Sequence, residues 1–170
     1  MLTINLFNGL VYGALLIVMS SGLALIYGLR RVVNFAHGAL YMLGAYLGYT
    51  VAIHSNFWVA LVVAPALMAG VGVLLDRYGF RLLQDREPLN VMLVTFGLLL
   101  ILEDLVVAIW GKGNHSIFTP TLLDGSVAVF GHDLPAYRIA VLFTGLAVAA
   151  GLTVWLRCSR VGLFVRAAST

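Results

Sequence analysis

The sequence predicts an all-α, polytopic membrane protein with about five transmembrane helices and its N-terminus outside. Hydrophobic residues make up 62% of the 170 residues and charged residues only 10%, whereas soluble domains carry roughly 25% charged residues. One small soluble core cannot bury this much apolar surface, because a small domain leaves roughly a third or more of its surface in water. The composition therefore excludes a soluble enzyme, a nucleic-acid-binding module and a disordered chain.

Five apolar stretches are long enough to cross a bilayer, which takes about 20 residues of helix. They cover residues 6–29, 32–53, 57–75, 89–110 and 137–156. Each is too long and too unpatterned for a strand of a membrane barrel, whose signal is about ten residues of alternating character. We expect residues 1–170 to form a single transmembrane domain.

The first and third stretches carry packing signals. Gly9 and Gly13 lie at helical spacing in the first stretch, and small residues so placed let two membrane helices approach closely. We therefore expect this face to pack against a neighbouring helix. Pro65 interrupts the third stretch, where we expect a kink of the kind that membrane helices tolerate.

The second stretch is the least lipid-like of the five. If it were helical throughout, about 100° of its circumference would hold polar and small residues, namely Asn34, His37, Gly38, Tyr41, Ala45 and Gly48. Asn and His are costly in hydrocarbon unless paired, so this face should point into the helix bundle or a wet cavity. Two interpretations stay open. Either the first four line a translocation path, or they make interhelical hydrogen bonds beside close packing at Gly44 and Gly48.

The fourth stretch contains two adjacent carboxylates, Glu103 and Asp104. Neighbouring residues on a helix point about 100° apart. We expect one carboxylate to reach toward the outer interface while the other faces the bundle. A proton relay through these intramembrane acids stays open, although no Lys or Arg deep inside the stretches offers a counter-ion, since Arg138 is only the second residue of the fifth stretch.

The long segment between the fourth and fifth stretches predicts a short hairpin. Asp124-Gly125 separates residues 121–123 from residues 127–130, and this dipeptide favours a type I′ turn. The His and Asp side chains of the segment are His115, His132, Asp124 and Asp133. They lack the spacing of metal ligands, so we interpret them as solvated and expect no metal.

Arginine placement predicts the orientation. One side of the membrane would hold eight basic residues, namely Arg30, Arg31, Arg77, Arg81, Arg86, Arg157, Arg160 and Arg166, and the other side only Lys112 and Arg138. Short cytoplasmic loops are enriched in Lys and Arg, so the first side is cytoplasmic and the N-terminus lies outside. No basic segment precedes the first stretch, which favours a signal anchor over a cleaved signal peptide.

No catalytic triad, Cys–His pair, phosphate-binding loop or metal motif occurs in the sequence, so we expect neither an enzyme nor a cofactor. Specific motifs instead resemble a transport family. Three runs, Tyr27-Gly28, Val33-Asn34-Phe35-Ala36-His37-Gly38 and Tyr41-Met42-Leu43-Gly44-Ala45-Tyr46, resemble the membrane subunits of branched-chain amino-acid ABC importers. The segments 81–88, 159–162 and 166–167 are also similar to that family.

The resemblance implies a permease subunit that forms part of the path for branched-chain amino acids in a bacterial or archaeal cytoplasmic membrane. It implies as partners a second homologous permease subunit, two cytoplasmic ATPases and an extracytoplasmic binding protein, with ATP hydrolysis in the partners. Members of the family are longer than this chain, so we expect an N-terminal part of a permease, apparently truncated at its C-terminus. Two alternatives remain: a permease for urea or short amides, and a proton-coupled secondary carrier.

Overall fold

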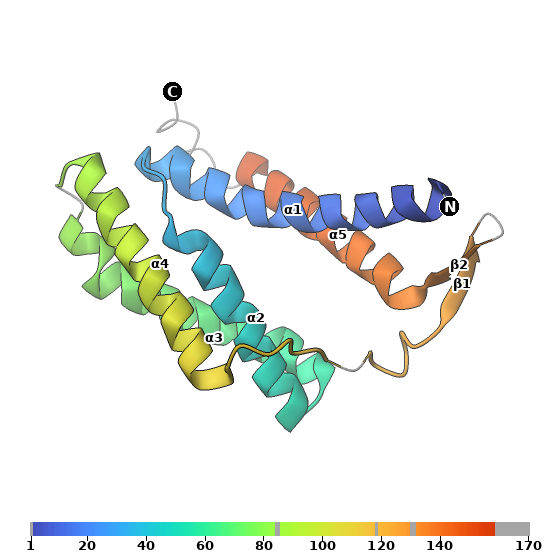
Figure 1. The fold of residues 1–170 in the computed structure, drawn as a ribbon. Helices are drawn as coiled ribbons and strands as arrows, with labels where there is room; N and C mark the ends of the chain where they lie inside the picture. Colours follow the sequence, from blue (N-terminus) through green and yellow to red (C-terminus); the bar gives the residue numbers. More distant parts are fainter. Residues whose placement is uncertain (1, 84–85, 118, 130–131, 159–170) are drawn as a thin grey trace. The chain divides into compact units, whose positions relative to one another are not determined.

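The computed structural model describes residues 2–83, 86–117, 119–129 and 132–158 (Figure 1). The elements follow in the order α1 (Leu2–Arg30), α2 (Ala36–His54), α3 (Phe57–Tyr78), the 3-10 turn η1 (Phe80–Leu83), α4 (Pro88–Trp110), β1 (Ser126–Val129), β2 (His132–Pro135) and α5 (Ala136–Cys158). The prediction of an all-α fold is confirmed, since the two short strands are the only sheet within the described ranges. Arg160 and Arg166 lie outside those ranges.

Four of the five helices are long and apolar enough to cross a membrane. Within the described part of the chain they are Ile4–Gly28, Phe57–Tyr78, Pro88–Trp110 and Ala136–Cys158. The remaining helix, α2, has 19 residues, which is about 28 Å of helix. It contains two histidines and three tyrosines.

The second helix begins later than the sequence predicted. We expected helix from residue 32, but α2 starts at Ala36, and Val32–Phe35 forms a connecting turn. Arg31 takes a left-handed conformation with φ of 52°, which ends α1. The Oδ1 atom of Asn34 then accepts the backbone N–H of Ala36 at 3.1 Å. Asn34 therefore lies in the turn that precedes α2 and is not on its helical face.

The other helices start close to the predicted positions because their first residues favour it. Asn56 precedes α3 and its side chain accepts the backbone N–H of Val59 at 2.9 Å, which is an N-terminal cap. Pro88 occupies the first turn of α4, where its missing N–H leaves no donor unsatisfied. Gly111 ends α4 with φ of 80°, a conformation that glycine adopts readily.

A hairpin precedes α5, but in a different register from the predicted one. Strands β1 and β2 are antiparallel and pair Ser126 with Pro135 and Val129 with His132. The residues between the strands are 130 and 131, which lie outside the described ranges, so the predicted turn at Asp124-Gly125 is wrong. The reason is local: Leu123 donates its N–H to the carbonyl of Pro120 at 2.8 Å, which closes a turn before any strand can begin.

The chain divides into two compact units. The first unit comprises α1, the hairpin and α5. In it, the small residues Ala14 and Gly145 meet: a Cβ on Gly145 would lie 3.1 Å from the Cβ of Ala14 and 3.4 Å from its carbonyl oxygen. Arg138 also donates to the side-chain oxygen of Asn8. These two contacts show that α1 and α5 run in the same direction.

The close approach on α1 lies at Ala14, whereas the sequence singled out Gly9 and Gly13. A Cβ built at either glycine would have nothing within 4 Å. The contact therefore uses a neighbouring position on the helix, and a packing role for Gly9 and Gly13 stays a prediction.

The second unit comprises α2, α3, η1 and α4. Helix α3 packs on the glycine edge of α2, since a Cβ at Gly44 would lie 3.3 Å from Met68 Cγ and one at Gly48 3.6 Å from Ala64 Cβ. Gly48 lies one turn after Gly44 on α2, whereas its contact Ala64 lies one turn before Met68 on α3. The two helices are therefore antiparallel. Helix α4 contributes Leu102 and Val106 to a buried cluster with residues 39 and 43 of α2.

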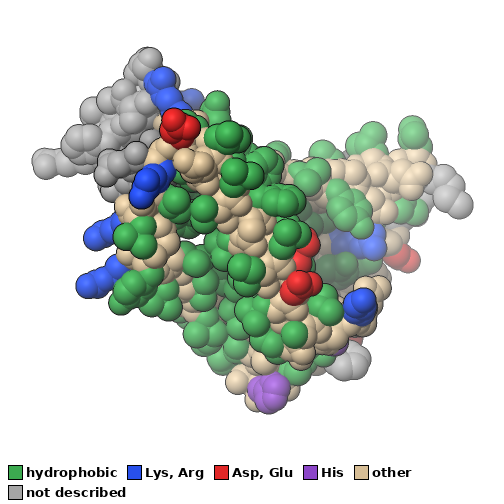
Figure 2. All heavy atoms as spheres, turned by 60° about the vertical axis from the view of Figure 1, so that its left-hand side comes forward, with side chains coloured by type: hydrophobic (Ala, Val, Ile, Leu, Met, Phe, Trp, Pro, Cys, Tyr) green, Lys and Arg blue, Asp and Glu red, His purple; other side chains and the backbone are tan. Residues whose placement is uncertain are grey.

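The surface is mostly apolar. Hydrophobic side chains cover much of the face drawn in Figure 2, and several Lys and Arg side chains lie along its left-hand edge. Many Leu, Val and Ile side chains on α3 and α4 are exposed. Such a surface is expected to contact lipid or further protein rather than water.

Candidate functional site: the start and open face of α2

The segment Asn34-Phe35-Ala36-His37-Gly38 is held by backbone-directed hydrogen bonds. Asn34 accepts two amide hydrogens: that of Ala36 at its Oδ1 atom at 3.1 Å and that of His37 at its carbonyl oxygen at 3.3 Å. The amide of Phe35 donates to the hydroxyl oxygen of Thr95 on α4 at 3.3 Å. Three backbone donors at the start of α2, those of Phe35, Ala36 and His37, thus have acceptors.

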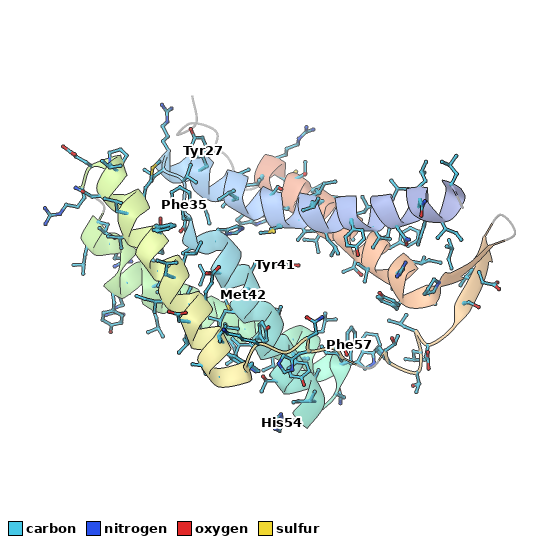
Figure 3. The ribbon with its side chains drawn as sticks, viewed as in Figure 1. Tyr27, Phe35, Tyr41, Met42, His54 and Phe57 are labelled. Atoms are coloured by element: carbon cyan, nitrogen blue, oxygen red, sulfur yellow. The ribbon has the colours of Figure 1, made fainter. Side chains whose placement is uncertain are left out.

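Phe35 is fixed to α4 by its ring as well. Its ring centroid lies 6.3 Å from that of Phe96, with the planes at 86°, an edge-to-face arrangement that aromatic pairs prefer. Consecutive residues of α4, Thr95 and Phe96, therefore hold the backbone and the side chain of Phe35. Figure 3 shows Phe35 where the beginning of α2 adjoins α4.

Two sides of α2 are covered by neighbouring helices and a third is open. Ala36 and Ala39 are buried, Ala36 completely, and these small residues allow α2 and α4 to approach closely. The third side carries Gly38, Tyr41 and Ala45, of which Tyr41 is 51% exposed. Tyr41 lies on the side of α2 away from α4 (Figure 3).

His37 lies at the edge of this open face and is partly buried. Of the predicted path-lining residues, His37, Gly38 and Tyr41 thus share one region of α2. Asn34 lies just before the helix, where its side chain accepts the backbone N–H of Ala36.

The opposite end of α2 carries an aromatic and polar cluster. Trp110 Nε1 donates to Thr50 Oγ1 at 2.7 Å, and the hydroxyl of Thr50 donates to the carbonyl of Tyr46 at 2.9 Å. The Trp110 ring lies 5.4 Å from that of Tyr46, and His115 lies against the rings of Tyr46 and Tyr49. This cluster ties the end of α4 to the last turns of α2.

Glu103 and Asp104 are not gathered with His37. Both carboxylates are exposed on α4, next to the residues that pack against α2. The pairs Phe35–Thr95 and Thr50–Trp110 show that α2 and α4 run parallel with a constant offset. Glu103 therefore lies about 9 Å further along the pair than His37, at 1.5 Å per residue. The structure does not assemble the three groups into one proton-transfer site.

Sequence reasoning missed Thr95 and the cluster around Trp110. A lone threonine in the apolar run of α4 gave little signal, because a threonine there commonly bonds only to its own helix. Trp110 gives no signal in the sequence beyond closing the stretch 89–110. Among the described residues, no group of three His, Cys, Asp or Glu side chains is placed to hold a metal ion.

A family model described as a branched-chain amino acid transport system permease component matches residues 5–170. The chain belongs to this family. Its relatives include the high-affinity branched-chain amino acid transport system permease protein LivH of Escherichia coli K12, which is 23% identical over 182 residues. The corresponding protein BraD of Pseudomonas aeruginosa is 27% identical over 180 residues. Each alignment covers 96% of this chain.

The chain spans 57% of the length of these permease relatives. No solved structure matches it. The resemblance that the Asn-Phe-Ala-His-Gly segment suggested is therefore confirmed at the level of the family, and the segment can be assigned to the turn and first helical turn that open α2.

Proposed function

We propose that this chain forms part of the membrane-spanning permease subunit of an ATP-driven importer for branched-chain amino acids. The family match over residues 5–170 carries the proposal, and the relatives' names specify branched-chain amino acid transport. They lend no support to urea, short amides or a proton-coupled carrier. Its partners would be a second homologous permease subunit, two cytoplasmic ATPases and an extracytoplasmic binding protein.

Within each unit, taken by itself, the helix directions agree with five successive membrane crossings. In the first unit α1 and α5 run the same way. In the second unit α2 and α4 are parallel and α3 is opposed to both. Arg77, Arg81 and Arg86 therefore lie at the end of the second unit where α2 begins. Positive residues favour the cytoplasmic side, which supports an outer N-terminus. The relatives come from bacteria, which supports a multi-pass protein of a bacterial or archaeal cytoplasmic membrane.

The open face of α2 is the part of this chain that we assign to the translocation path. His37, Gly38 and Tyr41 combine polar groups with a small residue in an otherwise apolar helix unit. The hydroxyl of the half-exposed Tyr41 is costly beside lipid tails. Facing a path that a zwitterionic amino acid crosses, this hydroxyl would instead offer hydrogen bonds.

The test is uptake by the complete transporter in proteoliposomes. Wild-type complex should take up labelled leucine when ATP is supplied to the ATPases and should not respond to a proton gradient alone. His37→Leu should abolish uptake while the amount of assembled complex is retained. The matched control is His54→Leu, because His54 is an exposed residue at the other end of the same helix and should tolerate the change.

Two results would count against the proposal. Leucine uptake driven by a proton gradient without ATP would reject the ATP-driven importer. Uptake that falls only in proportion to lost complex in His37→Leu would reject a path-lining role for His37 and leave it a structural one.

A further inference from the structure

We infer that Thr95 is a positioning residue for the path-lining face of α2: its hydroxyl sets the register of the Asn34–Gly38 segment on α4. The inference rests on the proposed function, because it concerns the same face. Thr95 is 1% exposed and is the one buried polar side chain among the described residues. A hydroxyl in so apolar a position costs free energy unless it is hydrogen-bonded.

The Thr95 hydroxyl is used in both directions. It donates to the carbonyl of Met92, one turn earlier on α4, at 3.0 Å. Its oxygen accepts the backbone N–H of Phe35 at 3.3 Å. The first bond holds the rotamer of Thr95 and leaves the oxygen directed at the turn before α2. Thr95 thereby joins the backbone of α4 to the backbone of the segment that precedes His37.

Apolar contacts alone would not set this register. Between the two ends, α2 and α4 meet through Ala39, Leu43, Leu102 and Val106, and such contacts are non-directional. The polar contacts at the ends both join residues 60 positions apart, Phe35 to Thr95 and Thr50 to Trp110. A slip by one helical turn would break both bonds at once, so the two helices are held in one register.

The consequence reaches the open face through the first turn of α2. Phe35 immediately precedes the helix. His37 lies in the first turn of α2, and Tyr41 lies about one turn later on the same side. If the Phe35 amide loses its acceptor, the first turn can fray or shift, and both side chains move with it. Thr95 acts through the backbone of Phe35 and does not itself lie on the open face.

The experiment measures hydrogen exchange and uptake on the same variants of the complete transporter. Thr95→Val keeps the shape and removes the hydroxyl, and should raise the exchange rate of the peptide containing the Phe35 amide about three- to tenfold, the range expected for one lost hydrogen bond. Leucine uptake per assembled complex should fall by a similar factor. Thr95→Ser keeps the hydroxyl and should restore both. Thr144→Val is the matched control, since Thr144 donates only to Ala140 of its own helix.

Unchanged exchange at Phe35 in Thr95→Val would overturn the inference, as would a Thr95→Ser variant that fails like Thr95→Val.

If Thr95→Val does not assemble, Phe35→Pro and Phe35→Ala replace it. Both variants lack the phenyl ring of Phe35, but only the proline variant also lacks the backbone N–H. The φ of −66° at position 35 already suits proline. Lower thermal stability of Phe35→Pro than of Phe35→Ala supports the bond, and equal stability refutes it. Absence of leucine uptake by wild type, with altered exchange in Thr95→Val, would reject the proposed function and keep the positioning role.

Discussion

The contact between α1 and α5 predicts that Gly145→Ala destabilises the protein although alanine favours helices. A methyl group on Gly145 would lie 3.1 Å from Ala14 Cβ and 3.4 Å from the carbonyl carbon and oxygen of Ala14. The latter two are backbone atoms and cannot rotate away, so α1 has to move. If α1 and α5 move apart, the contacts around Ala14 and Gly145 become looser.

The magnitude follows from two opposed terms. Replacing glycine by alanine inside a helix contributes about 1 kcal/mol of stability, and overpacking a close contact costs about 1–3 kcal/mol. The net change in the free energy of unfolding is then about 0–2 kcal/mol of destabilisation. The matched control is Gly151→Ala on the same helix, where nothing lies within 4 Å, so only the favourable term of about 1 kcal/mol applies.

The measurement compares the melting temperatures of the two variants in the same detergent. Gly145→Ala should melt below Gly151→Ala, by about 2–4 °C for each kcal/mol that separates them. Ala14→Gly removes the carbon nearest to the added methyl group. In the Ala14→Gly background, Gly145→Ala should therefore lower the melting temperature by less than it does in the wild type. If Gly145→Ala is as stable as Gly151→Ala, the two helices do not approach as closely as the structure has them.

Two further predictions concern the orientation and the second cluster. In a Cys158→Ser background, Ser126→Cys should react with a membrane-impermeant thiol reagent added outside and Leu82→Cys should not; the reverse labelling would invert the proposed orientation. Trp110→Phe loses the 2.7 Å bond to Thr50 and should lower the free energy of unfolding by about 1 kcal/mol. Exposed Trp58 provides the control, and a Trp58→Phe variant that melts as low as Trp110→Phe would show that the bond does not stabilise the protein.

Much of the candidate site was predictable from the sequence, but its boundary was not. A helical period of 3.6 residues placed His37, Gly38 and Tyr41 on one face, and the structure keeps them together on α2. The same period placed Asn34 there too. It failed because Asn34 belongs to a turn, where a side-chain oxygen that accepts a nearby amide competes with continuing the helix.

The sequence by itself determined that the chain is helical and membrane-spanning, because the length and apolarity of a stretch decide whether it can cross lipid. It also determined the family, through the Asn-Phe-Ala-His-Gly segment. Only the tertiary structure decided that Thr95 accepts from Phe35, that Ala14 meets Gly145, and that residues 126–129 pair with residues 132–135. Those outcomes depend on which residues distant in sequence become neighbours, and hydrophobic periodicity carries no information about the partner that a face will meet.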